Sequence, residues 1–182
     1  MKPQMYLGAA VVFVSLVPVV SGFPSGDRGT GSRTSESDAT LQAMSADAVK
    51  QRLVGTWKMV KWEVFSENGA SRPGTYDVGR LTYGDQGEMT AHLMRSGRPK
   101  VAPATEAARA AAYQGYLGYF GPYTIDPDQR IVVHHVAGSS FPHWIGTDQI
   151  RHYGFSEDGS QLMLSLQTGD RVTQTLTWER MR

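Results

Sequence analysis

The chain has 182 residues, of which 40% are hydrophobic and 19% charged, and its formal net charge at pH 7 is +1. This length suits one domain with a sizeable core, and the near-neutral charge gives no electrostatic reason to expect nucleic acid as a partner. The chain contains no cysteine, which excludes a disulfide framework, a thiolate zinc site, a cysteine nucleophile and a lipoprotein anchor.

Residues 1–22 have the features of a signal peptide. Lys2 gives a positive start, residues 5–20 are almost all apolar, and Val20-Ser21-Gly22 places small residues where a signal peptidase cuts. We expect cleavage before Phe23 and a periplasmic or secreted protein with no transmembrane domain after cleavage. The alternative is an uncleaved N-terminal anchor, which also places the domain outside the cytoplasm.

Residues 23–44 are predicted to be a disordered linker that precedes a domain over residues 45–182. Up to about residue 40 the linker is rich in glycine, serine, threonine, aspartate and arginine, and such a segment buries too little to offset its ordering entropy. Ser45 is placed to cap a short helix over residues 48–52. This helix would deliver the chain to Leu53 and close one end of the fold.

The rest of the chain predicts an all-β fold. Runs rich in β-branched and aromatic residues alternate with turn signals such as Asn68-Gly69 and Gly84-Asp85-Gln86-Gly87. About eight strands joined by short turns are typical of an antiparallel up-and-down closed barrel, and closure removes the exposed sheet edges. The predicted strands are 55–65, 78–83, 88–94, 119–125, 130–136, 149–155, 161–166 and 172–180.

An alanine-rich stretch over residues 105–117 interrupts this pattern. Ala108, Ala112 and Tyr116 recur at helical spacing, and small side chains let a helix lie close to another surface. We predict a helix across one barrel end, with a plain packing helix as the alternative.

Several short motifs follow one another in order through residues 53–182. They are Leu53-Val54-Gly55-Thr56-Trp57, Gly79-Arg80-Leu81-Thr82-Tyr83, Gly87-Glu88-Met89, Met94-Arg95, Arg98-Pro99, Tyr116 to Tyr123, Val133-His134-His135-Val136, residues 141–147, Gln149-Ile150-Arg151 and Trp178-Glu179-Arg180. Together they resemble the lipocalin-like domains of bacteria and fungi. The resemblance implies a calycin-type barrel with a central cavity. It also implies structural roles for Gly55, Trp57 and Arg180, with Trp57 packed at the closed end beneath Arg180.

The five histidines all fall between positions 92 and 152. His134 and His135 are adjacent on a predicted strand, so their side chains point to opposite faces and cannot hold one metal ion together. The flanking pattern does not choose the inward residue, and the resemblance favours His134. We predict no metal and no cofactor, although a single inward histidine can also ligate haem iron.

Two further features suggest a binding site. Arg151 shares a strand face with Tyr153 and would suit a carboxylate or an enolate as a polar anchor; the alternative is a surface arginine. The loop over residues 139–146 carries Phe141 and Trp144, which would either plug a barrel end or form the rim of a pocket.

We therefore expect an exported lipocalin-like protein that binds a small apolar or amphipathic molecule, with an acidic or carbonyl group, in its barrel. The alternatives are an isomerase or cyclase that uses His134 and Arg151, and a structural envelope protein whose barrel is filled. Phosphate-loop, serine-hydrolase and metalloprotease motifs are missing, whereas a histidine general base remains open. Of these interpretations we prefer binding to catalysis. The candidate ligand-binding residues are Tyr83, His92, Met94, Tyr116, Tyr119, Tyr123, His134, Trp144, Arg151 and Tyr153.

Overall fold

A computed structural model describes residues 44–182 with the exception of 101 and 103. The predicted signal peptide and residues 23–43 of the predicted linker lie outside the described residues. No helix in the described part of the chain is long and apolar enough to cross a membrane.

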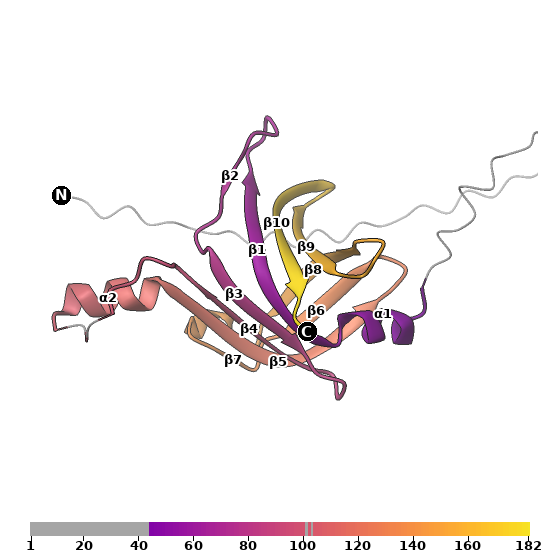
Figure 1. Cartoon of the computed structure of the whole chain (residues 1–182), viewed down its shortest axis with the longest axis horizontal. Coiled ribbons are helices and arrows are strands. Elements are labelled where there is room, and N and C mark those ends of the chain that lie inside the picture. The colour runs from indigo at the N-terminus through magenta and orange to yellow at the C-terminus, as the bar shows by residue number, and fades with distance from the viewer. Residues whose placement is uncertain (1–43, 101, 103) are drawn as a thin grey trace, which may run out of the picture. The chain divides into compact units, whose positions relative to one another are not determined.

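The domain is a closed antiparallel barrel (Figure 1). Its strands pair in the order β1-β3-β4-β5-β6-β8-β9-β10, and β10 pairs back with β1. This confirms the predicted all-β closed barrel of about eight strands. Two short strands, β2 and β7, pair with β1 and β5. The strands are β1 (Gly55–Phe65), β2 (Ser71–Pro73), β3 (Val78–Tyr83), β4 (Glu88–Met94), β5 (Tyr116–Asp126), β6 (Ile131–His135), β7 (Gly138–Ser139), β8 (Asp148–Phe155), β9 (Gln161–Thr168) and β10 (Arg171–Arg180).

Alternation along the strands decides which side chains face inward. In β4, Met89, Ala91 and Leu93 are buried while the residues between them are exposed, because successive side chains of a strand point to opposite faces. In β3, Leu81 and Tyr83 are likewise buried at alternate positions. The inward set from all the long strands forms one hydrophobic core.

A β-bulge in β1 changes which residues of that strand face the interior. Trp57 and Met59 are buried, and the pairing of β1 with β10 then shifts register between Met59 and Lys61. An extra residue in one strand reverses the alternation beyond it. Trp62 and Val64 consequently face inward in the second half of β1.

Helix α1 (Ala46–Leu53) closes one end of the barrel. Ser45 caps it by accepting a hydrogen bond from the Ala48 amide, as the sequence predicts. Val49 and Leu53 are completely buried and belong to the core. The Trp57 indole Nε1 donates to the Leu53 carbonyl at 2.8 Å, so the last turn of α1 is tied to the first inward side chain of β1.

Trp57 and Arg180 join the first strand to the last. They are directly paired in the β1–β10 register, and the Arg180 guanidinium lies 4.1 Å from the centre of the Trp57 ring system. The guanidinium also donates to the Val54 carbonyl at 2.9 Å and to the Arg52 carbonyl. One side chain therefore closes the sheet and satisfies carbonyls at the end of α1.

Gly55 is required at this junction for two reasons. Its φ of +128° lies in a region that favours glycine. A Cβ atom at this position would also stand 2.9 Å from an Arg180 guanidinium nitrogen. The glycine thus lets Arg180 reach the chain that leaves α1.

Helix α2 (Glu106–Gln114) is shorter than predicted, and it stands at the barrel end rather than lying over it. Thr105 caps it, but residues 116 and 117 already belong to β5. None of its residues is buried, and in Figure 1 most of the helix extends away from the strands. It contacts the barrel through its C-terminal end, where Tyr113 packs edge-on against Phe141 and the Gln114 carbonyl accepts from the Tyr76 hydroxyl.

Replacement of Arg180 by lysine tests this junction. Lysine keeps the positive charge but loses the planar fork that reaches both carbonyls. We expect Arg180→Lys to lower the free energy of unfolding by about 1–3 kcal/mol, measured by urea denaturation. Arg171→Lys, at the exposed other end of β10, is the matched control. Equal stability of the two variants would contradict a closing role for Arg180.

Candidate functional site

A partly enclosed cavity of about 410 Å³ lies inside the barrel, toward the end away from α1. Leucine and aromatic side chains make up most of its lining. The polar lining residues are Arg72, Thr75, Gln149, Arg151 and Gln174, and none of the lining residues is acidic. The barrel is therefore hollow, contrary to the alternative of a filled structural barrel.

Arg151 is the charged group held deepest in this cavity. It lies on the inward face of β8 and is only 9% exposed, so the alternative of a surface arginine is wrong. Its guanidinium donates to the Ile150 carbonyl at 2.8 Å and to Gln149 Oε1 at 3.3 Å. No ion pair within the described residues involves Arg151. A buried cation without a counter-ion is costly, so its remaining donors favour an oxygen atom from a ligand.

Beside Arg151, a chain of three buried polar side chains begins at the cavity wall and continues behind it. The Tyr83 hydroxyl lies 2.7 Å from His134 Nε2, and the Tyr119 hydroxyl lies 3.0 Å from His134 Nδ1. Tyr119 lines the cavity, whereas Tyr83 and His134 lie behind it. The resemblance correctly favoured His134 over His135 as the inward histidine.

These three groups are neutral at pH 7. Burial lowers the pKa of His134 well below 6.5, and the nearby positive charge of Arg151 adds to the effect. Burial also raises the pKa of Tyr83 and of Tyr119, which Arg151 partly offsets. Both nitrogens of His134 are occupied by tyrosine hydroxyls, and the imidazole is outside the cavity lining, so it offers no free base to a molecule in the cavity.

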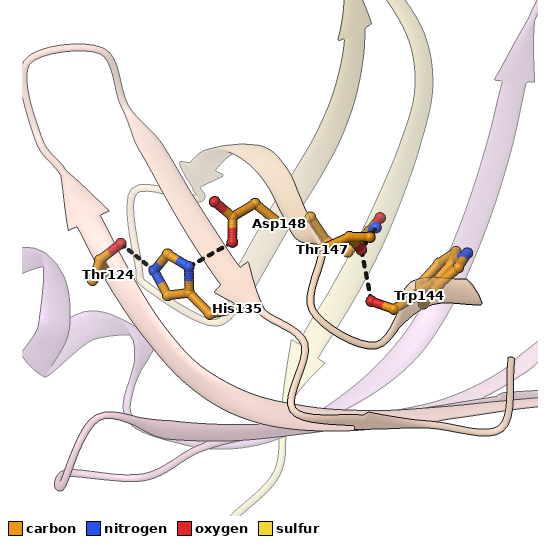
Figure 2. A network of polar contacts seen from close by, with 6 residues as sticks. Thr124, His135, Trp144, Thr147 and Asp148 are labelled. Carbon is orange, nitrogen blue, oxygen red and sulfur yellow. Dashed lines mark hydrogen bonds and ion pairs between the residues drawn. The ribbon is translucent and has the colours of Figure 1, made fainter. Parts of the chain in front are cut away.

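His135 faces the other side of the same strand, as adjacent strand residues must. Its Nδ1–H donates a hydrogen bond to the Asp148 carboxylate at 2.7 Å, and its Nε2 lies 2.9 Å from the Thr124 hydroxyl (Figure 2). These contacts join β5, β6 and the start of β8. They hold the two ends of the segment between β6 and β8, which carries the rim of the cavity.

The rim is formed by residues 139–146, including the short 3-10 helix η1 (Pro142–Trp144). Phe141 and Trp144 line the cavity, which favours the rim over the plug, and the Trp144 ring packs edge-on against Tyr119 with centroids 5.5 Å apart. The segment is fastened by a hydrogen bond from the Thr147 hydroxyl to the Trp144 carbonyl at 2.7 Å (Figure 2) and by the Gly146 amide to the Val136 carbonyl.

Two of the other candidate residues are buried without lining the cavity. Tyr123 packs edge-on against Tyr83, and its hydroxyl donates to the Gly84 carbonyl at 2.9 Å. Tyr153 packs against Phe155, which stacks beneath Arg52 of α1. Tyr153 therefore belongs to the closed end, and Tyr123 supports the polar chain from behind.

Three candidates lie on the outer surface, so the expectation that they line the cavity is not met. His92 and Met94 occupy the outward positions of β4. Tyr116 opens β5 on the same outer face, where its hydroxyl contacts His92 Nδ1 and Arg98 lies over its ring. The early start of β5 removed Tyr116 from the predicted helix.

Sequence reasoning missed several residues that line the cavity. Trp62 faces inward only because of the bulge in β1, and its indole donates to Gln174 Oε1 at 3.0 Å. Tyr76 lies in the segment between β2 and β3, outside any strand. Gln174 lies on the same face of β10 as Leu176 and Trp178, a shared parity that was visible in the sequence.

Comparison with known proteins agrees with this architecture. The family model for the lipocalin-like domain matches residues 54–181. The chain belongs to the lipocalin-like domain family. A 4'-hydroxy-3'-methoxypropiophenone carrier protein of Aspergillus oryzae is 33% identical over 112 residues, a match that covers 51% of this chain and 96% of that protein.

Among solved structures, a redesigned beta barrel covers 73% of this chain and 95% of its own, with a TM-score of 0.38 and 12% sequence identity. The barrel is established by the closed strand pairing of the chain itself.

The buried neutral state of His134 predicts a pH-dependent stability. Below the unfolded-state pKa of about 6.5, the unfolded chain takes up a proton that the folded chain does not, because burial lowers the folded-state pKa. The free energy of unfolding should therefore fall as the pH decreases from 7 to 5. Uptake of one proton by His134 on unfolding contributes a slope that approaches about 1.4 kcal/mol per pH unit. Urea denaturation at several pH values measures the slope, and His134→Gln should flatten it. An unchanged slope in that variant would contradict a neutral buried imidazole.

Proposed function

We propose that the lipocalin-like domain binds a small, mostly apolar molecule that carries a carbonyl or acidic oxygen. The observation that best supports this proposal is the composition of the cavity. Its walls are mostly leucine and aromatic side chains, while Arg151 is buried among them with no ion pair in the described part of the chain. Apolar walls with a few convergent polar groups are characteristic of small-molecule sites.

The size of the cavity supports a single small ligand. About 410 Å³ falls in the lower part of the range of roughly 300–1,000 Å³ that such sites occupy. The cavity is also only partly enclosed, with Phe141 and Trp144 on its wall. A molecule of about one or two rings would fill it and contact the aromatic rim.

The carrier protein from Aspergillus oryzae supports a more specific ligand class. Its name gives 4'-hydroxy-3'-methoxypropiophenone as the molecule that it carries, which combines an aromatic ring with a ketone oxygen. The cavity here offers both kinds of contact, aromatic walls and the donors of Arg151 and Tyr119. We therefore propose an aromatic carbonyl compound as the first ligand to test.

Binding is better supported than an isomerase or cyclase reaction. The proposed catalytic pair was His134 with Arg151, but both His134 nitrogens contact tyrosine hydroxyls at hydrogen-bonding distance. A general base must reach the proton that it removes, and His134 is separated from the cavity by Tyr119. The same two contacts leave no free nitrogen for a haem iron.

We further propose that the protein acts outside the cytoplasm. This proposal is supported by the positive Lys2, by the apolar run over residues 5–20 and by the small residues Ser21 and Gly22 that follow it. N-terminal sequencing of the protein recovered from an extracytoplasmic fraction should begin at Phe23. Recovery in the cytoplasm with residues 1–22 retained would contradict export.

Isothermal titration calorimetry with 4'-hydroxy-3'-methoxypropiophenone tests ligand binding. We expect saturable binding of one molecule per chain. Ala91→Leu places extra volume on the cavity wall and should weaken binding at least ~10-fold. Arg151→Met removes the charged donors at similar length and should have an effect of about the same size.

Matched variants on the outer face separate the cavity from other surfaces. Thr90→Leu adds volume next to Ala91 but on the exposed side of β4, and Arg80→Met removes an exposed arginine from β3. Both should bind like the unmodified protein. A loss of affinity in these controls equal to that in the cavity variants, or no saturable binding at all, would contradict the proposal. Native mass spectrometry of the gently purified protein would detect a different resident molecule.

A further inference from the structure

In the polar chain formed by Tyr83, His134 and Tyr119, the positions of the protons decide which group donates each hydrogen bond. Tyr83, His134 and Tyr119 are buried, with exposures of 1%, 1% and 6%, and they contact one another in that order. Each tyrosine hydroxyl has one proton to donate, and a neutral imidazole has one N–H and one acceptor nitrogen. The arrangement is therefore decided by where each proton finds an acceptor.

The Tyr83 hydroxyl fixes the first step. Within the described residues, His134 Nε2 is the one acceptor at hydrogen-bonding distance from this hydroxyl. Because Tyr83 has no contact with the cavity, a Tyr83 proton turned away from Nε2 would be buried without an acceptor, which is unfavourable. Tyr83 therefore donates to Nε2, and the imidazole proton resides on Nδ1.

The second step directs Tyr119 toward the cavity. His134 Nδ1–H donates to the Tyr119 oxygen at 3.0 Å. The Tyr119 proton therefore makes no hydrogen bond to His134. The described residues offer this proton no acceptor at hydrogen-bonding distance. Tyr119 lines the cavity, and a proton without an acceptor in the protein is available to a molecule bound there.

Arg151 makes the same region of the cavity rich in donors. It lines the cavity beside Tyr119, and its positive charge acts on the Tyr119 hydroxyl strongly enough to offset part of the effect of burial on the Tyr119 pKa. Among the described residues, no acidic side chain lines the cavity. A ligand oxygen placed here would therefore meet the Tyr119 O–H and the Arg151 guanidinium.

We infer that Tyr83 and His134 position Tyr119 as a hydrogen-bond donor into the cavity, and that this donor selects ligands with a carbonyl-type oxygen acceptor over hydrocarbons of the same shape. The inference rests on the proposed function and narrows its ligand class. Tyr119 would touch the ligand directly. Tyr83 and His134 would be positioning residues that act through Tyr119.

The tautomer of His134 can be measured without any ligand. Nitrogen-15 NMR of the imidazole should show a protonated Nδ1 and an unprotonated Nε2 at pH 7. Tyr83→Phe removes the donor to Nε2 and should shift this population. Tyr123→Phe is the matched control, because Tyr123 packs against Tyr83 but donates to the Gly84 carbonyl instead of to His134. A proton on Nε2 in the unmodified protein would overturn the inference.

A pair of ligands then tests the selection. Propiophenone and propylbenzene have nearly the same shape and differ in the carbonyl oxygen. NMR titration should show the ketone binding at least ~10-fold more tightly than the hydrocarbon. Tyr119→Phe should remove most of this preference and leave what the Arg151 donors supply, and Tyr83→Phe should reduce it about threefold or more although Tyr83 does not contact the cavity. Tyr123→Phe should keep the preference within about twofold.

The outcomes separate the inference from the proposed function. If both probes bind in the cavity with equal affinity, and Tyr119→Phe changes neither, the cavity is a binding site but the donor role is wrong. If neither probe binds, the proposed function fails and the ligand class fails with it. A preference that survives Tyr119→Phe but is lost in Arg151→Met would assign the selection to Arg151 alone and overturn the role of the polar chain.

Discussion

Closure of the barrel by Arg180 is the constraint on which the rest of the structure depends. Arg180 lies over the ring of Trp57, opposite it in the register of the first and last strands, and donates to carbonyls at the end of α1. The sheet therefore has no open seam, and α1 is held against one end. Trp57, Val49 and Leu53 fill that end, and the cavity lies farther along the barrel.

A closed barrel also determines how polar groups inside it must behave. Tyr83, His134 and Tyr119 are buried, so each stays neutral and each proton favours an acceptor in the protein or in the cavity. Arg151 cannot become neutral in the same way, and its carbonyl and amide contacts leave donors free. The interior thus combines apolar walls with a small donor-rich area. This combination suits a molecule that is mostly hydrocarbon with an oxygen acceptor.

The fold was largely predictable from the sequence, whereas the site was predictable only in part. Alternating apolar residues and glycine-containing turns encode the strands locally. The barrel could therefore be predicted, and the strand pairing confirms it. Arg151 and Trp144 were also placed correctly in the lining. Trp62 was missed because a bulge reverses the alternation of β1, and a bulge has no clear local signal. His92 was misplaced because its strand face depends on which neighbouring residues are buried.

The most direct test of the binding account is a crystal structure of the protein with 4'-hydroxy-3'-methoxypropiophenone. We expect one molecule inside the barrel, with its ring against Trp144 and its ketone oxygen within hydrogen-bonding distance of the Tyr119 hydroxyl or the Arg151 guanidinium. A molecule bound only on the outer surface, for example beside His92, would contradict it. So would a barrel that excludes the compound at concentrations that saturate binding in solution.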